Sequence, residues 1–288
     1  MDQYVIDKAR VRAAFDRAAQ TYDAAAVLQK LVRDEMFSRL DLIKIAPHRI
    51  LDAGCGTGHG SFELQKRFKA AQVFSLDLAM GMLEKTHAQQ SLLNKLFRPK
   101  RLICADIENF PIADNSMDVV WSNLAIQWCN DLDKSFTGVA RLLKPNSLFI
   151  FSTFGPDTLK ELRAASNNGD THVSRFIDMH DIGDALTRHG FNAPVLDVER
   201  YTLTYDNVRA VMQDLKSIGA NNATQGRGRG LTGKGFFKQL AAQYEQFRIA
   251  GKLPATFEVI YGHAWTAEAK ADNGLGEGVS PVSFRPRG

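Results

Sequence analysis

The sequence is poor in cysteine, in long apolar runs and in excess charge. Its three cysteines are scattered without a Cys-x-x-Cys pair, which argues against disulfides or a zinc site and favours a reducing compartment. The longest apolar runs fall far short of the ~20 residues that a membrane helix needs. Charges at Asp2, Asp7, Lys8 and Arg10 argue against a secretory or transit signal. We therefore expect a cytoplasmic protein with no membrane partner and no metal.

What the chain does contain is enough material for a sizeable core. It has 288 residues, of which 44% are hydrophobic, an ordinary fraction for a globular protein. This length suits one large domain with an elaboration, or two small domains. The net charge of +4 is small, so the distribution of charge matters more than its sum.

The stretch from Arg49 to Gly60, with the sequence RILDAGCGTGHG, combines an apolar run, an acid and closely spaced glycines. A helix-like run follows over residues 61–68. Strand, glycine turn and helix form the first unit of a doubly wound α/β sheet, which binds ligands outside the carboxyl ends of its strands. The dinucleotide-binding fingerprint G-x-G-x-x-G needs a glycine at its sixth position. Counted from Gly54 that position is His59, so the strict form of the fingerprint is excluded.

Three more strand-like runs each end in a polar side chain. Residues 71–77 end at Asp77, residues 100–106 at Asp106, and residues 117–123 at Asn123. An acid about 20 residues beyond the glycine turn is placed to accept hydrogen bonds from a ribose diol. Any one of these acids would also suit a helix cap or a turn. Their order after successive strands favours a nucleoside-containing cofactor.

The pattern D-x-G-x-G-x-G resembles the first motif of the class I S-adenosylmethionine-dependent methyltransferases. The resemblance implies that the glycine loop faces the methionine part of the cofactor, with the Asp beside its α-amino group. It places an acid at the ribose, an acid and an apolar residue at the adenine, and residues 123–127, from the end of the fourth strand onward, beneath the sulfonium. The implied cofactor-binding residues are Asp52, Gly54, Gly56, Gly58, Asp77, Leu78, Asp106, Ile107 and Asn123.

The alternation of strands and helices predicts a Rossmann-like, doubly wound α/β fold with a mostly parallel seven-stranded sheet. Crossover helices are expected over 80–90 and 132–143, a helix opening near Pro156 over 154–163, and another over 179–189. We expect a helical arm or lid over 1–46 and a methyltransferase domain over 47–204 and 253–266. A basic helical insertion over 205–252, with helices at 208–217 and 236–249, and a flexible tail over 267–288 complete the division.

Several stretches resemble one family more closely, the biotin-pathway malonyl-[acyl-carrier protein] O-methyltransferases. They span residues 15 to 265; the most particular are Asn-Leu-Ala-Ile-Gln-Trp at 123–128 and Lys-Ser-Ile-Gly-Ala at 216–220. The resemblance implies methyl transfer from S-adenosyl-L-methionine to the free carboxylate of a malonyl thioester, leaving S-adenosyl-L-homocysteine. The expected partner is acyl carrier protein bearing malonyl-phosphopantetheine, with malonyl coenzyme A as an alternative acceptor.

A malonyl carboxylate is already ionised at pH 7, so the reaction needs no general base. Arg175 is the candidate that steers this carboxylate, because a guanidinium binds carboxylates through two parallel hydrogen bonds. A surface salt bridge is its alternative role, and a structural role is the alternative for His180, a second candidate. Tyr22 would close over the methionine end with Gln127 as a wall; otherwise Tyr22 is a core residue of the arm.

The predicted insertion is basic. Residues 200–260 contain nine Lys or Arg and four Asp or Glu, a net charge of +5. Acyl carrier proteins are acidic, and complementary charge speeds and orients docking. The alternative is a merely solvated basic surface; no aromatic residues are interleaved between 221 and 235, which argues against nucleic acid. The predicted docking residues are Arg209, Lys216, Arg227, Arg229, Lys234 and Lys238.

Two other functions fit the same stretches. One is that of a related complex I assembly factor, either an arginine hydroxylase or a non-catalytic module that binds S-adenosylmethionine. The other is methylation of a small molecule, which would not need the basic insertion. Methyl transfer to malonyl carrier protein would exclude the first.

Overall fold

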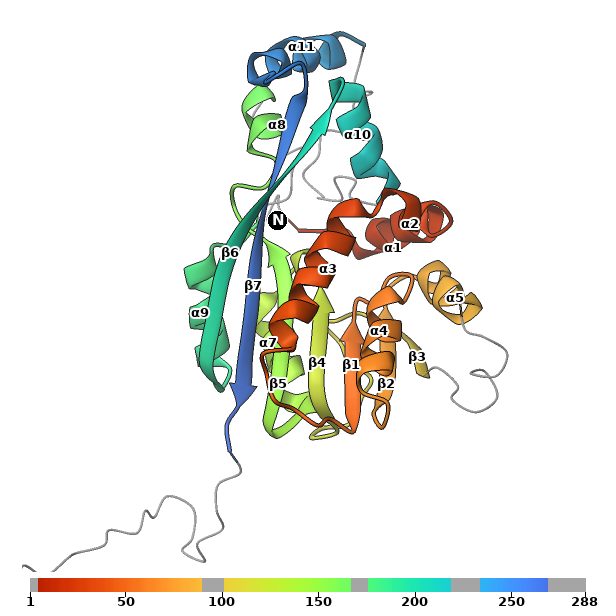
Figure 1. Ribbon diagram of the computed structural model, residues 1–288, viewed down its shortest axis with the longest axis vertical. Coiled ribbons are helices and arrows are strands. Elements are labelled where there is room, and N and C mark those ends of the chain that lie inside the picture. The colour runs from red at the N-terminus through yellow and green to blue at the C-terminus, as the bar shows by residue number, and fades with distance from the viewer. Residues whose placement is uncertain (1–4, 90–100, 167–175, 219–233, 269–288) are drawn as a thin grey trace, which may run out of the picture.

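The computed structural model describes residues 5–89, 101–166, 176–218 and 234–268 (Figure 1). None of the described helices is long and apolar enough to cross a membrane. The strands are β1 (Arg49–Ala53), β2 (Gln72–Asp77), β3 (Arg101–Cys104), β4 (Met117–Asn123), β5 (Leu143–Phe154), β6 (Phe191–Tyr205) and β7 (Leu253–Thr266). The helices are α1 (Lys8–Ala18), α2 (Tyr22–Ala25), α3 (Val27–Leu40), α4 (His59–Arg67), α5 (Met80–Ala88), α7 (Leu132–Leu142), α8 (Lys160–Ala165), α9 (Met179–Arg188), α10 (Val208–Ser217) and α11 (Lys234–Tyr244), with 3₁₀ turns at Ile126–Trp128 and Glu245–Phe247.

The described strands form one seven-stranded sheet in the order β3-β2-β1-β4-β5-β7-β6. Every neighbouring pair is parallel except those of β7, which runs antiparallel to β5 and β6. The order reverses between β1 and β4, the place where doubly wound sheets bind their ligands. The predicted Rossmann-like α/β fold is therefore confirmed.

Each face of the sheet has its own core. Ile50 and Leu51 are adjacent in β1 and fully buried, yet they belong to opposite cores, because successive strand residues point to opposite faces. Helices α3 and α4 cover one face, and α7 and α9 cover the other (Figure 1). On the first face Phe37 stacks on Trp121 with ring centroids 4.4 Å apart. Truncating a buried indole of this kind costs about 3–5 kcal/mol of folding free energy.

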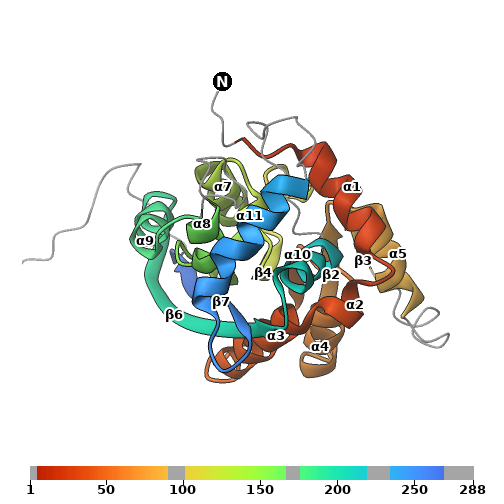
Figure 2. The same cartoon turned by 90° about the horizontal axis from the view of Figure 1, so that it is seen from above.

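Strands β6 and β7 form a long ribbon that outruns the rest of the sheet. They pair from Phe191 with Thr266 to Tyr205 with Leu253, whereas β5 pairs with β7 only as far as Val259. The chain between the paired ends carries α10 and α11 at the far end of the ribbon, where α11 packs against both α8 and α10 (Figures 1 and 2). This ribbon holds the predicted insertion beyond the carboxyl ends of the parallel strands.

The N-terminal arm divides into three helices. Helices α1 and α2 lie beyond the carboxyl ends of the strands, with α1 beside α5, whereas α3 packs on the sheet (Figures 1 and 2). Val11, Ala14 and Ala18 form the buried side of α1, and Leu28 and Val32 belong to that of α3. The arm therefore connects a face of the sheet with the edge where ligands bind.

The helix expected to open near Pro156 begins later, at Lys160. The preceding residues instead form a turn bonded to β7, in which the Thr158 hydroxyl donates to the carbonyl oxygen of Glu258 at 2.9 Å. The Leu159 N–H donates to the carbonyl oxygen of Thr256, and Leu159 has a left-handed φ of 56°. The position of Pro156 predicted a helix start that is wrong, because these residues are hydrogen-bonded to a strand 100 residues away.

Candidate cofactor and acceptor site

The glycine loop between β1 and α4 is held against the end of β2. The Gly54 N–H donates to the carbonyl oxygen of Leu76 at 2.8 Å. A Cβ atom on Gly54 would lie 2.2 Å from the Cβ of Ala125, so only glycine lets the loop approach the end of β4 this closely. At Gly56 a Cβ would meet nothing nearer than the Tyr22 ring, at 3.9 Å. The backbone at Gly56 is therefore bare toward the arm.

A cavity of about 610 Å³, partly open to solvent, lies between this loop, the carboxyl ends of the strands and the arm. The predicted residues that line it are Tyr22, Gly54, Gly56, Asp77, Leu78, Asp106, Ile107 and Asn123. Leu124 and Ala125 also line it and belong to the stretch 123–127 expected beneath the sulfonium. Sequence reasoning missed the other lining residues, which are Lys8, Val11, Phe15, Met82, Ala105, Trp128 and Cys129.

Asp77 ends β2 on the floor of the cavity. Its two carboxylate oxygens accept hydrogen bonds from the N–H groups of Gly56 and Ala79, each at 2.8 Å. Burial raises the pKa of Asp77 to about 6, although these hydrogen bonds act in the opposite direction. The carboxylate is thus fixed by main chain on both sides and is ionised at neutral pH.

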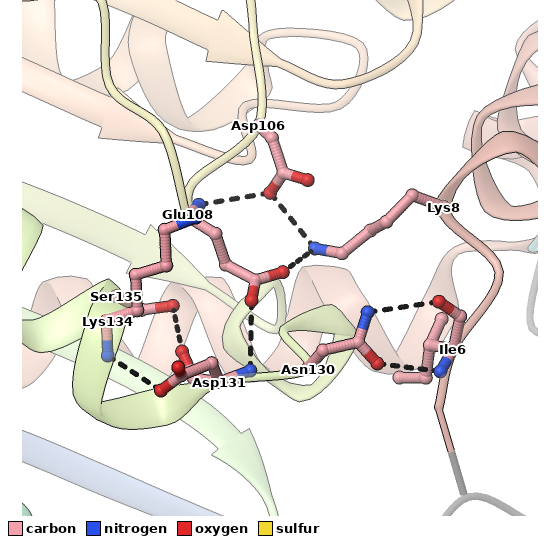
Figure 3. Close-up of polar contacts among 8 residues, drawn as sticks. All are labelled: Ile6, Lys8, Asp106, Glu108, Asn130, Asp131, Lys134 and Ser135. Carbon is pink, nitrogen blue, oxygen red and sulfur yellow. Dashed lines mark hydrogen bonds and ion pairs between the residues drawn. The ribbon is translucent and has the colours of Figure 1, made fainter. Parts of the chain in front are cut away.

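Asp106 follows β3 and is bound by the arm (Figure 3). Its Oδ1 accepts from the Lys8 ammonium at 3.0 Å and from the Glu108 N–H at 3.0 Å. Lys8 also forms an ion pair with the Glu108 carboxylate, which accepts the Asp131 N–H at 2.9 Å. These carboxylates raise the pKa of Lys8 although its burial alone would lower it. Lys8 therefore closes the edge of the cavity beside Asp106.

Three further contacts fasten the arm to the strand ends. Ile6 exchanges two main-chain hydrogen bonds with the Asn130 side chain, at 2.7 and 3.0 Å (Figure 3). The Asp16 carboxylate accepts the Gly81 N–H at the start of α5, at 2.8 Å. The Thr57 hydroxyl in the glycine loop donates to Asp23 at 2.5 Å. The arm is therefore a cover bonded to several loops.

Aromatic side chains form the underside of this cover. The Phe15 ring lies edge-on to Trp128, with centroids 5.4 Å apart, and 6.4 Å from the Tyr22 ring. Burial, with Asp77 and Asp23 nearby, raises the pKa of Tyr22, so its hydroxyl stays protonated. The cover thus presents an apolar surface with one neutral hydroxyl to the cavity.

The end of β4 is fixed by its own set of hydrogen bonds. Asn123 accepts from the Ser152 hydroxyl at 3.0 Å and donates to the main-chain oxygen of Gln29 at 3.2 Å. Gln127 donates to the carbonyl oxygen of Leu124 at 2.6 Å, within the turn that follows. Gln127 is not among the residues lining the cavity, so its amide braces this turn.

Asp52 lies below the loop and does not line the cavity. It is 2% exposed and accepts from the Ser61 hydroxyl at 2.6 Å, which in turn is bonded to the Ser75 hydroxyl. Burial raises the pKa of Asp52 to about 7. The resemblance predicted that Asp52 would lie beside the cofactor's α-amino group. In the structure β1 turns this side chain toward the core on one face of the sheet.

The remaining predicted residues are placed outside the cavity lining or outside the described residues. Gly58 is the residue before α4, with φ of 88°. His180 is exposed at the start of α9 and gives no support to an acceptor pocket there. Arg175 lies outside the described residues, although its neighbour Phe176 packs edge-on against Phe154 at the end of β5, 5.5 Å away.

The predicted docking residues divide in the same way. Arg209 and Lys216 on α10 and Lys238 on α11 are exposed. The Arg209 guanidinium lies over the Phe237 ring, 5.7 Å from its centroid, which joins the two helices. Arg227 and Arg229 lie outside the described residues, as does the side chain of Lys234.

Across the described parts of the chain, no three His, Cys, Asp or Glu side chains are arranged to hold a metal ion. The site instead offers a bare glycine backbone, two carboxylates at strand ends and an aromatic cover. Such a set suits a ligand with a sugar diol and a flat base.

Comparison with known proteins decides the family. Residues 51–151 match the methyltransferase domain family. A relative from Methylovorus sp. (strain MP688), named malonyl-[acyl-carrier protein] O-methyltransferase, is 63% identical over 99% of this chain and 97% of its own length. The chain belongs to the malonyl-[acyl-carrier protein] O-methyltransferase family. Relatives of the same name from Gallionella capsiferriformans and Laribacter hongkongensis are each 53% identical over 99% of this chain, covering 99% and 98% of their own lengths.

Solved structures show the same fold at low identity. The YcgJ protein of Bacillus subtilis covers 81% of this chain and 98% of its own, with a TM-score of 0.59 and 15% identity. Phosphoethanolamine N-methyltransferase 2 of Haemonchus contortus, in complex with S-adenosyl-L-methionine, covers 88% of this chain and 57% of its own, with a TM-score of 0.51 and 18% identity. The family and the fold thus agree with the expectation from the motifs, and the assembly-factor and small-molecule alternatives are not favoured.

Proposed function

We propose that this protein transfers the methyl group of S-adenosyl-L-methionine to the free carboxylate of a malonyl group carried on acyl carrier protein. The proposal is supported by two observations together: 63% identity over nearly the full length to a protein named malonyl-[acyl-carrier protein] O-methyltransferase, and a cavity at the β1–β4 reversal lined by strand-end carboxylates. Esterification removes a negative charge, so that fatty-acid enzymes can extend the chain toward the pimeloyl precursor of biotin.

The two strand-end carboxylates suit the two ends of an adenosine. Asp77, fixed by two N–H groups, would accept hydrogen bonds from the ribose diol. Lys8 and the Glu108 N–H both use Oδ1 of Asp106, which leaves Oδ2 to accept from the adenine amino group. Leu78 and Ile107 line the same cavity and would flank the base.

The acceptor half needs alignment more than acid–base chemistry. The bound cofactor supplies a sulfonium methyl group, and the malonyl carboxylate is already ionised at neutral pH. The protein must then align the oxygen with the methyl–sulfur bond and keep water out. Phe15, Tyr22 and Trp128 would exclude water from the methionine end. Arg175 would hold the carboxylate through two parallel hydrogen bonds.

The carrier protein would dock on the basic insertion over 205–252. Arg209 and Lys216 on α10 and Lys238 on α11 are exposed. These two helices lie beyond the carboxyl ends of the parallel strands (Figure 1). Raised ionic strength should therefore increase the KM for malonyl carrier protein much more than the KM for a small malonyl thioester. Equal salt effects on both substrates would place docking elsewhere.

The decisive assay incubates labelled S-adenosylmethionine with malonyl carrier protein, malonyl coenzyme A and malonic acid side by side. We expect labelled methyl ester, formed fastest on the carrier protein. The Arg175→Ala protein should bind the cofactor normally and form no ester. Wild-type protein that binds the cofactor and esterifies none of the three would overturn the proposal.

A further inference from the structure

A buried side-chain oxygen near the end of β4 has no hydrogen-bond partner. It is Oε1 of Gln29, in the first turn of α3. Buried polar atoms in folded proteins are nearly always paired, so each exception calls for a missing partner. In the ligand-free rotamer this oxygen is bonded neither to protein nor to solvent, so a rotamer that pairs it with a ligand group would be favoured.

The backbone of Gln29 is fixed to the cavity wall. Its main-chain oxygen accepts from the Asn123 side chain at 3.2 Å, and Asn123 lines the cavity. The amide of Gln29 does not itself line the ligand-free cavity. To reach a ligand in the cavity the Gln29 side chain would change rotamer, which needs no movement of the α3 backbone.

The same part of α3 also carries a positive charge. Arg33 lies one turn further along α3, its side chain is 18% exposed, and its contact with Asp34 is long, at 3.4 Å. Burial raises the pKa of Asp52 to about 7, and the charge of Arg33 opposes that rise. The same charge opposes the rise at Tyr22, where Asp77 and Asp23 act in the other direction. A carboxylate bound close to Arg33 would be favoured by its charge.

The amide oxygen of Gln29 needs an N–H donor, and the charge of Arg33 favours a carboxylate. The zwitterionic end of an amino acid offers both groups. We propose that Gln29 holds the amino-acid end of S-adenosylmethionine, its carbonyl accepting from the α-ammonium and its NH₂ donating to the α-carboxylate. This inference rests on the proposed function and adds a residue outside the glycine loop. It also gives the methionine end a ligand in place of Asp52, which lies below the loop.

The test compares two ligands that differ in that end alone. S-adenosylhomocysteine carries the amino acid and 5′-methylthioadenosine lacks it. In Gln29→Met, which keeps the side-chain length and removes the amide, calorimetric titration should show about tenfold weaker binding of S-adenosylhomocysteine, or about 1.4 kcal/mol. Affinity for 5′-methylthioadenosine should stay within about twofold of wild type, less than 0.5 kcal/mol.

Lys30→Met is the matched control, because Lys30 is the next residue of α3 and pairs only with Asp34 at the surface. It should bind both ligands as wild type does. Gln29→Met removes an unpaired buried atom, so its thermal unfolding midpoint should equal or exceed that of wild type. Unchanged S-adenosylhomocysteine affinity, or equal loss for both ligands, overturns this inference alone. Wild-type protein that binds neither ligand overturns the proposed function as well.

Discussion

Asp77 and Asp106 follow neighbouring strands and line the same cavity, yet the chain holds them in different ways. Asp77 is 8% exposed and bonded to main chain no more than 21 residues away. Asp106 has a side chain 21% exposed and is bonded to Lys8, which is 98 residues away. The sheet therefore fixes the first carboxylate without the arm, whereas the arm adds the Lys8 contact to the second. We expect the two carboxylates to differ in how strongly and by what route they control cofactor binding.

The largest effect should come from Asp77→Asn. The amide carries no charge, and it cannot accept from both Gly56 and Ala79 while also accepting from a diol. Hydrogen bonds to charged groups are worth about 1.5–3 kcal/mol each. We expect S-adenosylmethionine to bind about 100-fold more weakly by calorimetry. Asp114→Asn, at an exposed site, is the control and should bind S-adenosylmethionine normally. If Asp77→Asn weakened binding by less than threefold, Asp77 would not be the residue that binds the ribose.

A pH profile should separate the two carboxylates next. Burial raises the folded pKa of Asp77 to about 6, above the unfolded value of about 3.9. Its contribution to ligand-free stability is therefore fully present below about pH 4 and lost as pH rises through 6. Cofactor binding needs the ionised form, so affinity should fall about tenfold per pH unit below 6. Calorimetric titrations at pH 5, 6 and 7.5 should show this fall in cofactor affinity in wild type and a weaker dependence on pH in Asp77→Asn. Equal pH dependence in the two proteins would contradict the role of Asp77.

Lys8→Met should have a smaller effect, of a different kind. It removes the ion pairs that join the arm to Asp106 and Glu108 but leaves the carboxylate in place. The pair is partly exposed, so we expect a loss of about 1–2 kcal/mol, or roughly tenfold in affinity. Stopped-flow measurement should show that most of the lost affinity comes from faster cofactor dissociation, because the arm opens more readily. Arg10→Met, whose ion pair is local to α1, is the control that should change nothing.

The smallest effect should be that of Asn130→Ala. It removes two hydrogen bonds between neutral groups, both with the main chain of Ile6 (Figure 3). Each is worth about 1 kcal/mol or less at a partly exposed site. We expect about threefold faster cofactor dissociation. If Asn130→Ala increased the rate of cofactor dissociation more than Lys8→Met does, hydrogen bonds rather than the Lys8 ion pairs would be the main attachment of the arm.

The residues that sequence patterns found share a local signature. Gly54 directly follows β1, and Asp77 and Asn123 are the last residues of β2 and β4. Strand ends on a parallel sheet meet at one edge, so the position of these residues along the chain predicts their position in space. Asp52 has the same signature but points into the core, because strand alternation decides its face. Lys8 and Gln29 have no such signature and resemble ordinary helix residues in sequence.

By itself the sequence determined the parallel sheet, its glycine loop and the acids at its strand ends, since each depends on spacing over a few residues. Only the tertiary structure decided that Lys8 meets Asp106, that Asn130 holds Ile6, and that the amide oxygen of Gln29 is left without a partner. Those outcomes depend on how the arm packs over the sheet, across separations of up to 124 residues, where no local period carries information.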